Sequence, residues 1–191
     1  MRYPKDQKQA TRQRILEAAG RRFKADGIDG AGVAAVMSDA GLTNGAFYAH
    51  FASKEDLVAN VLAEQLRVQR ESFHAAPSDR GGLELLIRAY LSPEHRDQSA
   101  DGCPSAALLD EIGRCGDATK HAYTHGVLGL VDEIASRLAP SDPQAASGRT
   151  LSLFALLIGT LQLSRALADR RLADEVLERG IENALALLPG E

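Results

Sequence analysis

The chain has 191 residues, of which 45% are hydrophobic and 25% charged, and its formal net charge is −4. This composition is typical of a folded protein and excludes general disorder. Its two cysteines, Cys103 and Cys115, are too few for a disulfide framework, and their spacing fits no paired CxxC zinc site.

The first predicted element is a helix over residues 10–25, with Ile15, Leu16, Ala19 and Phe23 on one side, and Gly27 ends it. A short helix over 33–40 ends at Gly41, and a second short helix begins at the N-cap Thr43 and runs to His50. Ser53, with Asp56 three positions on, caps a long helix that runs to residue 75.

The rest of the chain continues in helices. The polar stretch 92–102 is predicted to be a mobile surface loop, and no alternating strand pattern appears. The remaining helices are predicted at 83–91, 104–114, 118–138, 145–168 and 172–188. The sequence therefore predicts an all-α fold, with a domain at 1–52, a second at 53–191, and helix 53–75 connecting the two.

Charge is distributed unevenly along these elements. Residues 1–24 hold eight basic and two acidic residues, which makes +6 and leaves −10 for the remainder of the chain. A basic arm on an acidic body is typical of a protein whose one end binds a polyanion, although a solvated basic helix face would look the same.

No export or membrane segment is predicted. The opening MRYPKDQKQATRQR lacks the apolar core of a secretory signal, and the longest apolar tract, residues 151–163, is shorter than the roughly 20 residues that cross a bilayer. We therefore expect a cytoplasmic protein without membrane contact.

The segment from Val33 to His50 has the proportions of a helix-turn-helix, whose second helix enters the DNA major groove. Phe47 and Phe51, four residues apart, are predicted to face inward. The side chains of Tyr48, His50 and Lys54 would then face outward, with hydrogen-bond donors suited to phosphate oxygens.

The stretch from Thr11 to about Leu62, with TRQRILEAAGRRFKADG, AGL and FYAHFASKEDL, resembles the TetR-like (TetR/AcrR) transcriptional regulators. The resemblance implies an amino-terminal three-helix DNA-binding domain and a larger helical domain for ligand binding and dimerisation. It also implies a homodimer, usually a repressor, that binds a roughly palindromic operator in double-stranded DNA and leaves it when a small-molecule effector binds.

The resemblance carries over to individual positions of the helix-turn-helix. Thr43 corresponds to the phosphate-contacting cap, and Asn44, Gly45 and Ala49 lie where the family reads bases. The chain departs from the family at Gly32, where a Ser or Thr hydroxyl is usual and a backbone N–H could substitute. The predicted DNA-binding residues are Gly32, Thr43, Asn44, Gly45, Ala46, Tyr48, Ala49, His50 and Lys54.

An effector pocket is predicted between the carboxy-terminal helices. Its candidate residues are Tyr90, Cys103, Tyr123 and Phe154, for which packing in the core is the alternative. Cys103 precedes Pro104 at a helix start, where the helix dipole favours a thiolate, so redox or electrophile sensing is a second possible mode of release.

Two further features leave alternatives open. Asp117, His121 and His125 recur every four residues, as in a metal site or a solvated helix edge, but no metal or cofactor is expected. A helical enzyme or ligand carrier is the alternative from another functional class. No GxSxG, P-loop or metal-ligand spacing supports it, so the chain is expected not to be an enzyme.

The helix at 145–168 is apolar almost all round, so it needs a second buried surface. Either a twin subunit covers it in a four-helix seam, or it lies centrally within one subunit. The predicted seam residues are Leu153, Leu157, Leu161, Leu177, Ile181 and Leu185.

Overall fold

The computed structural model describes residues 3–189, with side chains from residue 6 onward, and no strand occurs in this range, which confirms the all-α prediction. The first four elements are α1 (Tyr3–Asp26), α2 (Val33–Asp39), the 3₁₀ helix η1 (Asn44–Ala49) and α3 (Lys54–Ala75). The others are α4 (Arg80–Tyr90), α5 (Pro93–Asp97), η2 (Ser99–Asp101), α6 (Pro104–Arg114), α7 (Asp117–Leu138), α8 (Pro143–Ala166) and α9 (Arg170–Ala186).

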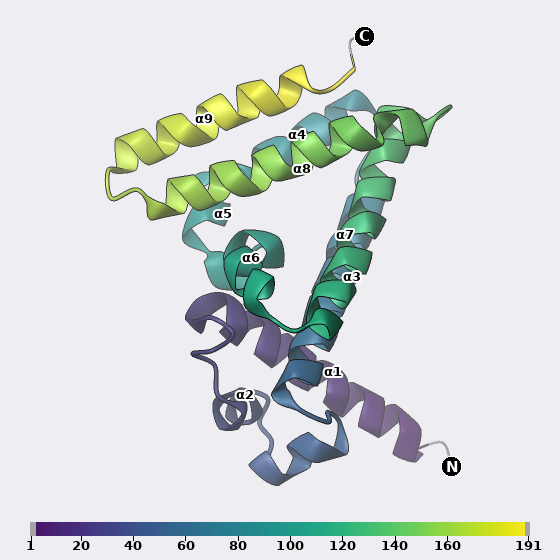
Figure 1. The fold of residues 1–191 in the computed structure, drawn as a ribbon, viewed down its shortest axis with the longest axis vertical. Helices are drawn as coiled ribbons and strands as arrows, with labels where there is room; N and C mark the ends of the chain where they lie inside the picture. Colours follow the sequence, from purple (N-terminus) through teal and green to yellow (C-terminus); the bar gives the residue numbers. More distant parts are fainter. Residues whose placement is uncertain (1–2, 190–191) are drawn as a thin grey trace.

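The helices are arranged in two groups joined by a stalk. Figure 1 shows α1, α2 and η1 at the lower end, α3 and α7 rising side by side from it, and α8 and α9 crossing the upper end. The helix α6 lies between the two groups. Movements of the upper helices can therefore reach the lower group through α3 and through α6.

Two glycines form the turns of the lower group. Gly27 (φ 80°) ends α1 and Gly41 (φ 67°) follows α2, and both adopt the left-handed conformation that other residues avoid. At the second turn the backbone N–H groups of Gly41 and Leu42 donate to the carbonyls of Ser38 and Met37, each at 2.9 Å. The predicted helix-ending role of both glycines is confirmed.

The predicted short helix after Thr43 is present with Thr43 at its N-cap, but it is a 3₁₀ helix and the Thr43 side chain makes no capping hydrogen bond. Its backbone bonds join residues three apart, as in Ala46 N–H to Thr43 O (3.0 Å) and His50 N–H to Phe47 O (2.9 Å). A six-residue segment containing Gly45 forms too few α-helical bonds to offset the cost of starting a helix, and 3₁₀ geometry is common in such short pieces.

One hydrophobic core joins the lower group to the rest of the protein. It includes Phe23 of α1, Met37 of α2 and both Phe47 and Phe51, and it continues into α3 as far as Leu62. Leu108 and Ile112 of α6 pack into the same core. A second core under α4, α7, α8 and α9 holds the upper group together.

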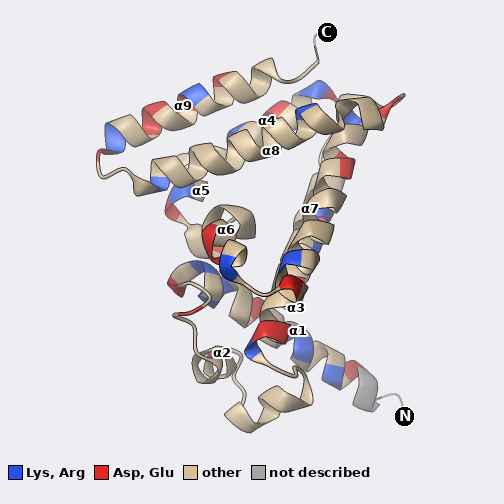
Figure 2. Cartoon of the chain, in the orientation of Figure 1, with Lys and Arg blue, Asp and Glu red and all other residues tan. Residues whose placement is uncertain are grey.

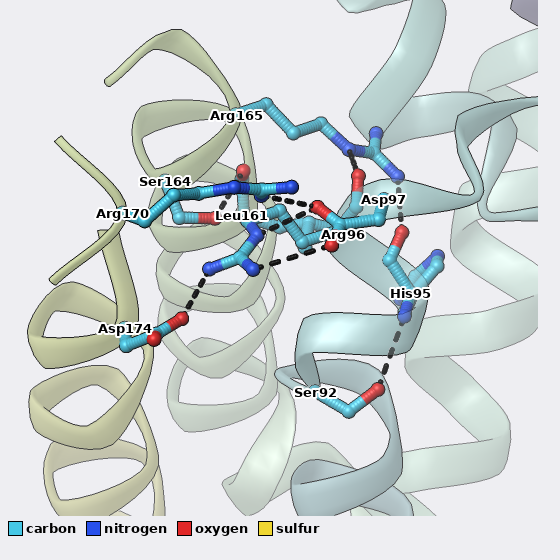
Figure 3. Close-up of polar contacts among 9 residues, drawn as sticks. All are labelled: Ser92, His95, Arg96, Asp97, Leu161, Ser164, Arg165, Arg170 and Asp174. Atoms are coloured by element: carbon cyan, nitrogen blue, oxygen red, sulfur yellow. Dashed lines mark hydrogen bonds and ion pairs between the residues drawn. The ribbon is translucent and has the colours of Figure 1, made fainter. Parts of the chain in front are cut away.

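The stretch 92–102, predicted to be a mobile loop, is instead folded into α5 and η2. Figure 3 shows Arg96 reaching from α5 toward Asp174 of α9, with Asp97 beside it. Arg96 is only 7% exposed, and its Nε donates to Asp97 at 2.8 Å. Hydrogen bonds from Arg96 and then Arg170 hold the pKa of Asp97 well below its usual range.

Arg165 of α8 completes this junction by donating to the backbone carbonyls of His95 (2.8 Å) and Arg96 (3.1 Å). The expectation of a loop was wrong because its partners lie on α8 and α9, about 70 residues further along the chain. No local hydrophobic pattern predicts such contacts.

The leucines of α8 also differ from the prediction. Leu153, Leu157, Leu161 and Leu177 are at most 6% exposed within the single chain, so they form its core and offer no surface to a second subunit. The other two predicted seam residues, Ile181 and Leu185, are half-buried against the upper core. The expected seam is therefore corrected: Leu153, Leu157 and Leu161 explain why α8 is apolar, but not what covers its outer face.

The outer face of α8 presents Leu151 (48% exposed) and Leu163 (51%), with exposed Gly148, Ala155 and Gly159 in line with them. Among the described helices, α8 alone has the length and composition that would allow a membrane crossing. The packing of its buried side against α7 and α9 accounts for much of that apolar character.

Candidate functional site

The turn between α2 and η1 presents a row of small, exposed side chains. Thr43, Asn44, Gly45 and Ala49 are exposed, and Tyr48 is 77% exposed. Phe47 and Phe51 lie behind them at 1–2% exposure, which confirms their predicted inward orientation. The Phe47 ring meets Tyr48 edge-on at 5.2 Å, so the core supports the tyrosine from behind.

Three positions on this surface can approach a ligand closely. Thr43 is at the N-cap of η1, but its hydroxyl makes no capping bond and remains available to an external partner. At Gly32, the N-cap of α2, and at Gly45, an added Cβ would meet no atom within 4 Å. Ala46 is the exception among the predicted contacts, because it is half-buried against the core.

His50 and Lys54 are less free than the sequence predicted. Lys54 is half-buried and its Nζ lies 3.4 Å from the carbonyl of Asp29. Burial, followed by the charges of Lys8 and Arg12, lowers the pKa of His50 below its ordinary value. The neutral form of His50 is therefore favoured at neutral pH, and it offers one N–H donor rather than a positive charge.

The exposed surface formed by residues 43–49, called the recognition surface below, carries no charged side chain. Residues 40–53 contain no Asp, Glu, Lys or Arg, and Figure 2 shows this part of the lower group without blue or red. Positive charge comes instead from α1, where Lys8 is exposed. The side chains of Arg2 and Lys5, which belong to the predicted basic arm, lie outside the described residues.

Much of the predicted basic arm holds the fold together. Arg12 donates to Asn60 Oδ1 at 2.7 Å and lies 4.8 Å from the ring centre of Phe51, while Arg14 donates to the carbonyl of Ala40 at 2.5 Å. Arg22 pairs with Asp39 at 2.5 Å. Sequence reasoning missed these roles, because charge density alone does not distinguish an arginine that binds a partner from one that binds its own backbone.

Two contacts tie the lower group to the body. Lys24 Nζ donates to the carbonyl of Gly102 at 2.8 Å, and burial lowers the pKa of this lysine. Glu111 on α6 accepts the backbone N–H of Ile28 at 2.7 Å. The position of α1 is therefore coupled to α6 and to the segment that precedes it.

Three of the four predicted effector residues come together. Tyr90 and Tyr123 each have their pKa raised, mainly by burial and in part by Cys103. The hydroxyl of Tyr123 donates to Ser105 Oγ at 2.9 Å, whereas the buried hydroxyl of Tyr90 has no partner among the described residues. Phe154 is half-buried on α8, and no aromatic pair in the described chain joins it to either tyrosine.

A cavity of about 590 Å³ lies at a different place from the one predicted. Of the four predicted residues, only Cys103 lines it, and this residue is 5% exposed. Its walls are α1, α3 and residues 101–104 rather than the carboxy-terminal helices: Leu16, Glu17, Arg21, Lys24, Glu64, Gln65, Val68, Gln69, Asp101, Gly102 and Pro104 are among the lining residues.

No metal centre is evident in the described part of the chain. There, no three His, Cys, Asp or Glu side chains lie close enough to hold an ion. Asp117, His121 and His125 are exposed along α7, as on a solvated helix edge.

Known proteins resemble this chain in sequence at one end and in fold throughout. A family model described as "Bacterial regulatory proteins, tetR family" matches residues 15–61. Two regulators of Pseudomonas putida are each 34% identical over 89 residues, or 47% of this chain: the HTH-type transcriptional regulator SrpR and the uncharacterized HTH-type regulator TtgW. The match covers 42% of SrpR and 66% of TtgW, less than two thirds of either protein.

The similarity beyond the amino-terminal end is one of fold. The crystal structure of Escherichia coli NemR in its reduced form aligns with a TM-score of 0.78 over 95% of this chain and 98% of that chain, at 17% identity. A transcriptional regulator from Cytophaga hutchinsonii aligns with a TM-score of 0.75 at 20% identity, over 97% of this chain and 98% of its own.

Proposed function

Because the chain belongs to the TetR family of bacterial transcriptional regulators, we propose that it is a repressor that binds a roughly palindromic operator as a homodimer. In this proposal a small-molecule effector releases it from DNA, and the protein acts in the cytoplasm. The division into a DNA-binding domain (1–52) and an effector and dimerisation domain (53–191) belongs to the same proposal.

The observation that carries the proposal is the exposed row from Thr43 to Ala49 on a rigid support. Its small side chains leave room for base edges and phosphates, and Phe47 and Phe51 fix its orientation from behind. Asn44 can make paired hydrogen bonds to a base edge, and Tyr48 and Thr43 can donate to phosphates. Methyl groups and DNA shape would supply the rest of the specificity, because few long polar side chains are available.

The outer faces of α8 and α9 are the proposed dimer surface. Gly148, Ala155 and Gly159 would let a second helix approach closely, with Leu151 and Leu163 beside them and Leu172 on α9. Residues 43–49 of the two subunits would then have to lie about 34 to 36 Å apart, or a multiple of that, to reach successive major grooves. An effector that binds better to a different separation would lower operator affinity.

The test begins with an operator selected from a random double-stranded library, because the natural operator is unknown. Fluorescence anisotropy of the labelled operator should give saturable binding that weakens as salt rises, with two protein chains per site. A promoter fusion carrying the operator should be less active when the protein is present. Failure to enrich any sequence, or equal binding to scrambled DNA, would refute the proposal.

A second mode of release, through Cys103, is supported by one observation. The thiol lies at the N-cap of α6 on the wall of the 590 Å³ cavity, 3.7 Å from Gln69 Oε1. Native-state labelling with N-ethylmaleimide should then modify Cys103 and lower operator affinity, and Cys103→Ser should abolish that response. An intact mass that stays unchanged at Cys103 would remove this alternative.

A further inference from the structure

The 590 Å³ cavity lies between α1, a helix of the lower group, and α3. Its α1 wall consists of residues at helical spacing from Gln13 to Lys24, and its opposite wall comes from α3. A molecule in this cavity would touch both helices at once. Leu16 and Val68 face it from the two sides and supply apolar surface.

One polar group in the wall lacks a partner. Gln65 Oε1 is buried and accepts no hydrogen bond from the described residues. Its side chain lies across α1 at Gly20, where an added Cβ would come within 1.9 Å of Gln65 Nε2. A glycine inside a helix is unfavourable, so its position beneath Gln65 has a physical reason: it makes room for an amide at the cavity wall. A buried acceptor without a donor is the kind of group that a bound molecule can satisfy.

Two carboxylates lie at the same end of the cavity. Gln13 Nε2 donates to Glu64 at 3.0 Å and to Glu17 at 3.2 Å, so one amide nitrogen is within hydrogen-bond distance of both. Arg67 holds the pKa of Glu64 below its usual range, and Glu64 therefore stays ionised. Arg67 does not line the cavity, but it donates to both oxygens of Glu64, at 2.9 and 2.8 Å. Glu17 accepts only from Gln13 among the described residues, so Glu17 keeps most of its acceptor capacity and Glu64 keeps part of its own.

The cationic side chains of the cavity lie further along α1. Lys24 already donates to Gly102 and is next to Asp101, and Arg21 is exposed beside it. From Glu17 the helix rises about 6 Å to Arg21 and about 10 Å to Lys24, so the cationic side chains lie one to two turns from the acceptor-rich end of the cavity.

We propose that this cavity binds a small organic molecule carrying a protonated amine. The ammonium group donates to Glu17, Glu64 and Gln65 Oε1, and the apolar body packs between Leu16 and Val68. The site lies between α1 and α3. A bound molecule therefore changes the position of residues 43–49 relative to the proposed dimer surface on α8 and α9. This effector role rests on the proposed function, whereas binding of the amine does not.

Three probes with one ring system and different charges test the site: 1-naphthylmethylamine (cation), 1-naphthoate (anion) and 1-naphthylmethanol (neutral). Isothermal titration calorimetry on the full chain should show the amine binding at least tenfold more tightly than the other two. Gln65→Leu and Glu17→Gln should each weaken amine binding at least fivefold. Glu178→Gln, the same charge change on exposed α9, should leave it unchanged.

The proposal is overturned if the amine does not bind, if naphthoate binds as tightly, or if neither cavity variant weakens binding while circular dichroism shows both folded. A separate arm tests the effector role by anisotropy on the selected operator. The amine should lower the operator affinity of the wild type but leave that of Glu17→Gln nearly unchanged. This variant also controls for amine that binds to the DNA, because such binding would affect both proteins equally. An unchanged operator affinity with the amine bound overturns the effector role alone, and failure to bind any DNA refutes the proposed function instead.

Discussion

At the scale of single residues, Tyr48 and Asn44 are expected to contribute differently to DNA binding. Tyr48→Phe removes one exposed hydroxyl and should weaken binding to every sequence by about 1 kcal/mol, roughly fivefold. Asn44→Ala should cost about 1–3 kcal/mol on the selected operator and less on operators changed at the base pair it reads. Anisotropy against a panel of single-base operator variants measures both, with Tyr90→Phe as the control, because Tyr90 packs against the upper core and its hydroxyl has no partner among the described residues. An equal loss on all sequences from Asn44→Ala would contradict its base-reading role.

The half-buried His95, which also lines the 590 Å³ cavity, should make stability depend on pH. Its Nδ1 donates to the carbonyl of Tyr90 at 2.7 Å and its Nε2 accepts the N–H of Cys103 at 3.0 Å, a pattern that requires the neutral ring. Burial, followed by the charges of Arg165 and Lys24 and opposed by the Tyr90 bond, lowers its pKa. The unfolded chain therefore binds the proton more readily, and the free energy of unfolding should fall as pH drops through the ordinary histidine range near 6.5 and below.

Urea unfolding at about pH 7.5 and pH 5.5 checks this expectation. His95→Gln removes the titrating group, so the variant should lose less stability than the wild type between the two pH values. Comparing the two proteins cancels the contributions of His50 and of the carboxylates, which both retain. The same loss in both proteins would show that His95 does not titrate in this range.

At the scale of elements, the turn between α2 and η1 depends on its glycine. Gly41→Ala places a side chain at φ 67° with Arg14 Nη2 only 3.1 Å from the new Cβ, and should cost about 1–2 kcal/mol of stability. Gly45→Ala is the matched control, because its φ is not positive and the new Cβ meets no atom within 4 Å. Urea midpoints of the two variants distinguish a backbone requirement from a general effect of removing glycine.

The same element shows how far local patterns reach. The spacing of Phe47 and Phe51 predicts that both are buried, because residues four apart lie on one face of an α-helix. The structure buries both side chains although Asn44–Ala49 is a 3₁₀ helix. The spacing does not predict 3₁₀ geometry, which depends on the few backbone bonds that a six-residue segment between two turns can form. For α5, the structure has Ser92 as the N-cap and Pro93 in the first turn, and the contact between Arg96 and Asp174 joins this segment to α9.

At the scale of the whole molecule, the proposed dimer depends on the outer face of α8. Leu163→Asp should place a charge in the seam and convert the dimer to a monomer, as sedimentation velocity would detect. Leu128→Asp makes the same change at an equally exposed leucine (51% for each) on α7 and should leave the dimer intact. Because a monomer reaches only one half-site, the first variant should also lose at least tenfold in operator affinity. Dimers in both variants would place the interface elsewhere.

The features that could be predicted from the amino-acid sequence depend on neighbours within a turn or two of helix. These are the all-α fold, the positive-φ glycines Gly27 and Gly41, the inward Phe47 and Phe51, and the resemblance to the TetR family. Helical spacing, caps and turn residues are local physics, so one segment at a time is enough to recognise them.

Which apolar and charged groups already have partners within the chain depends on the three-dimensional packing of the helices. This packing buried Leu153, Leu157 and Leu161 within one chain, ordered α5 through Asp174, and engaged Arg12 and Arg14 within the fold. It also opened the cavity between α1 and α3 instead of between the carboxy-terminal helices. Each of these outcomes depends on partners far apart in the sequence, and a periodic pattern shows that a side chain needs a partner without showing which one it finds.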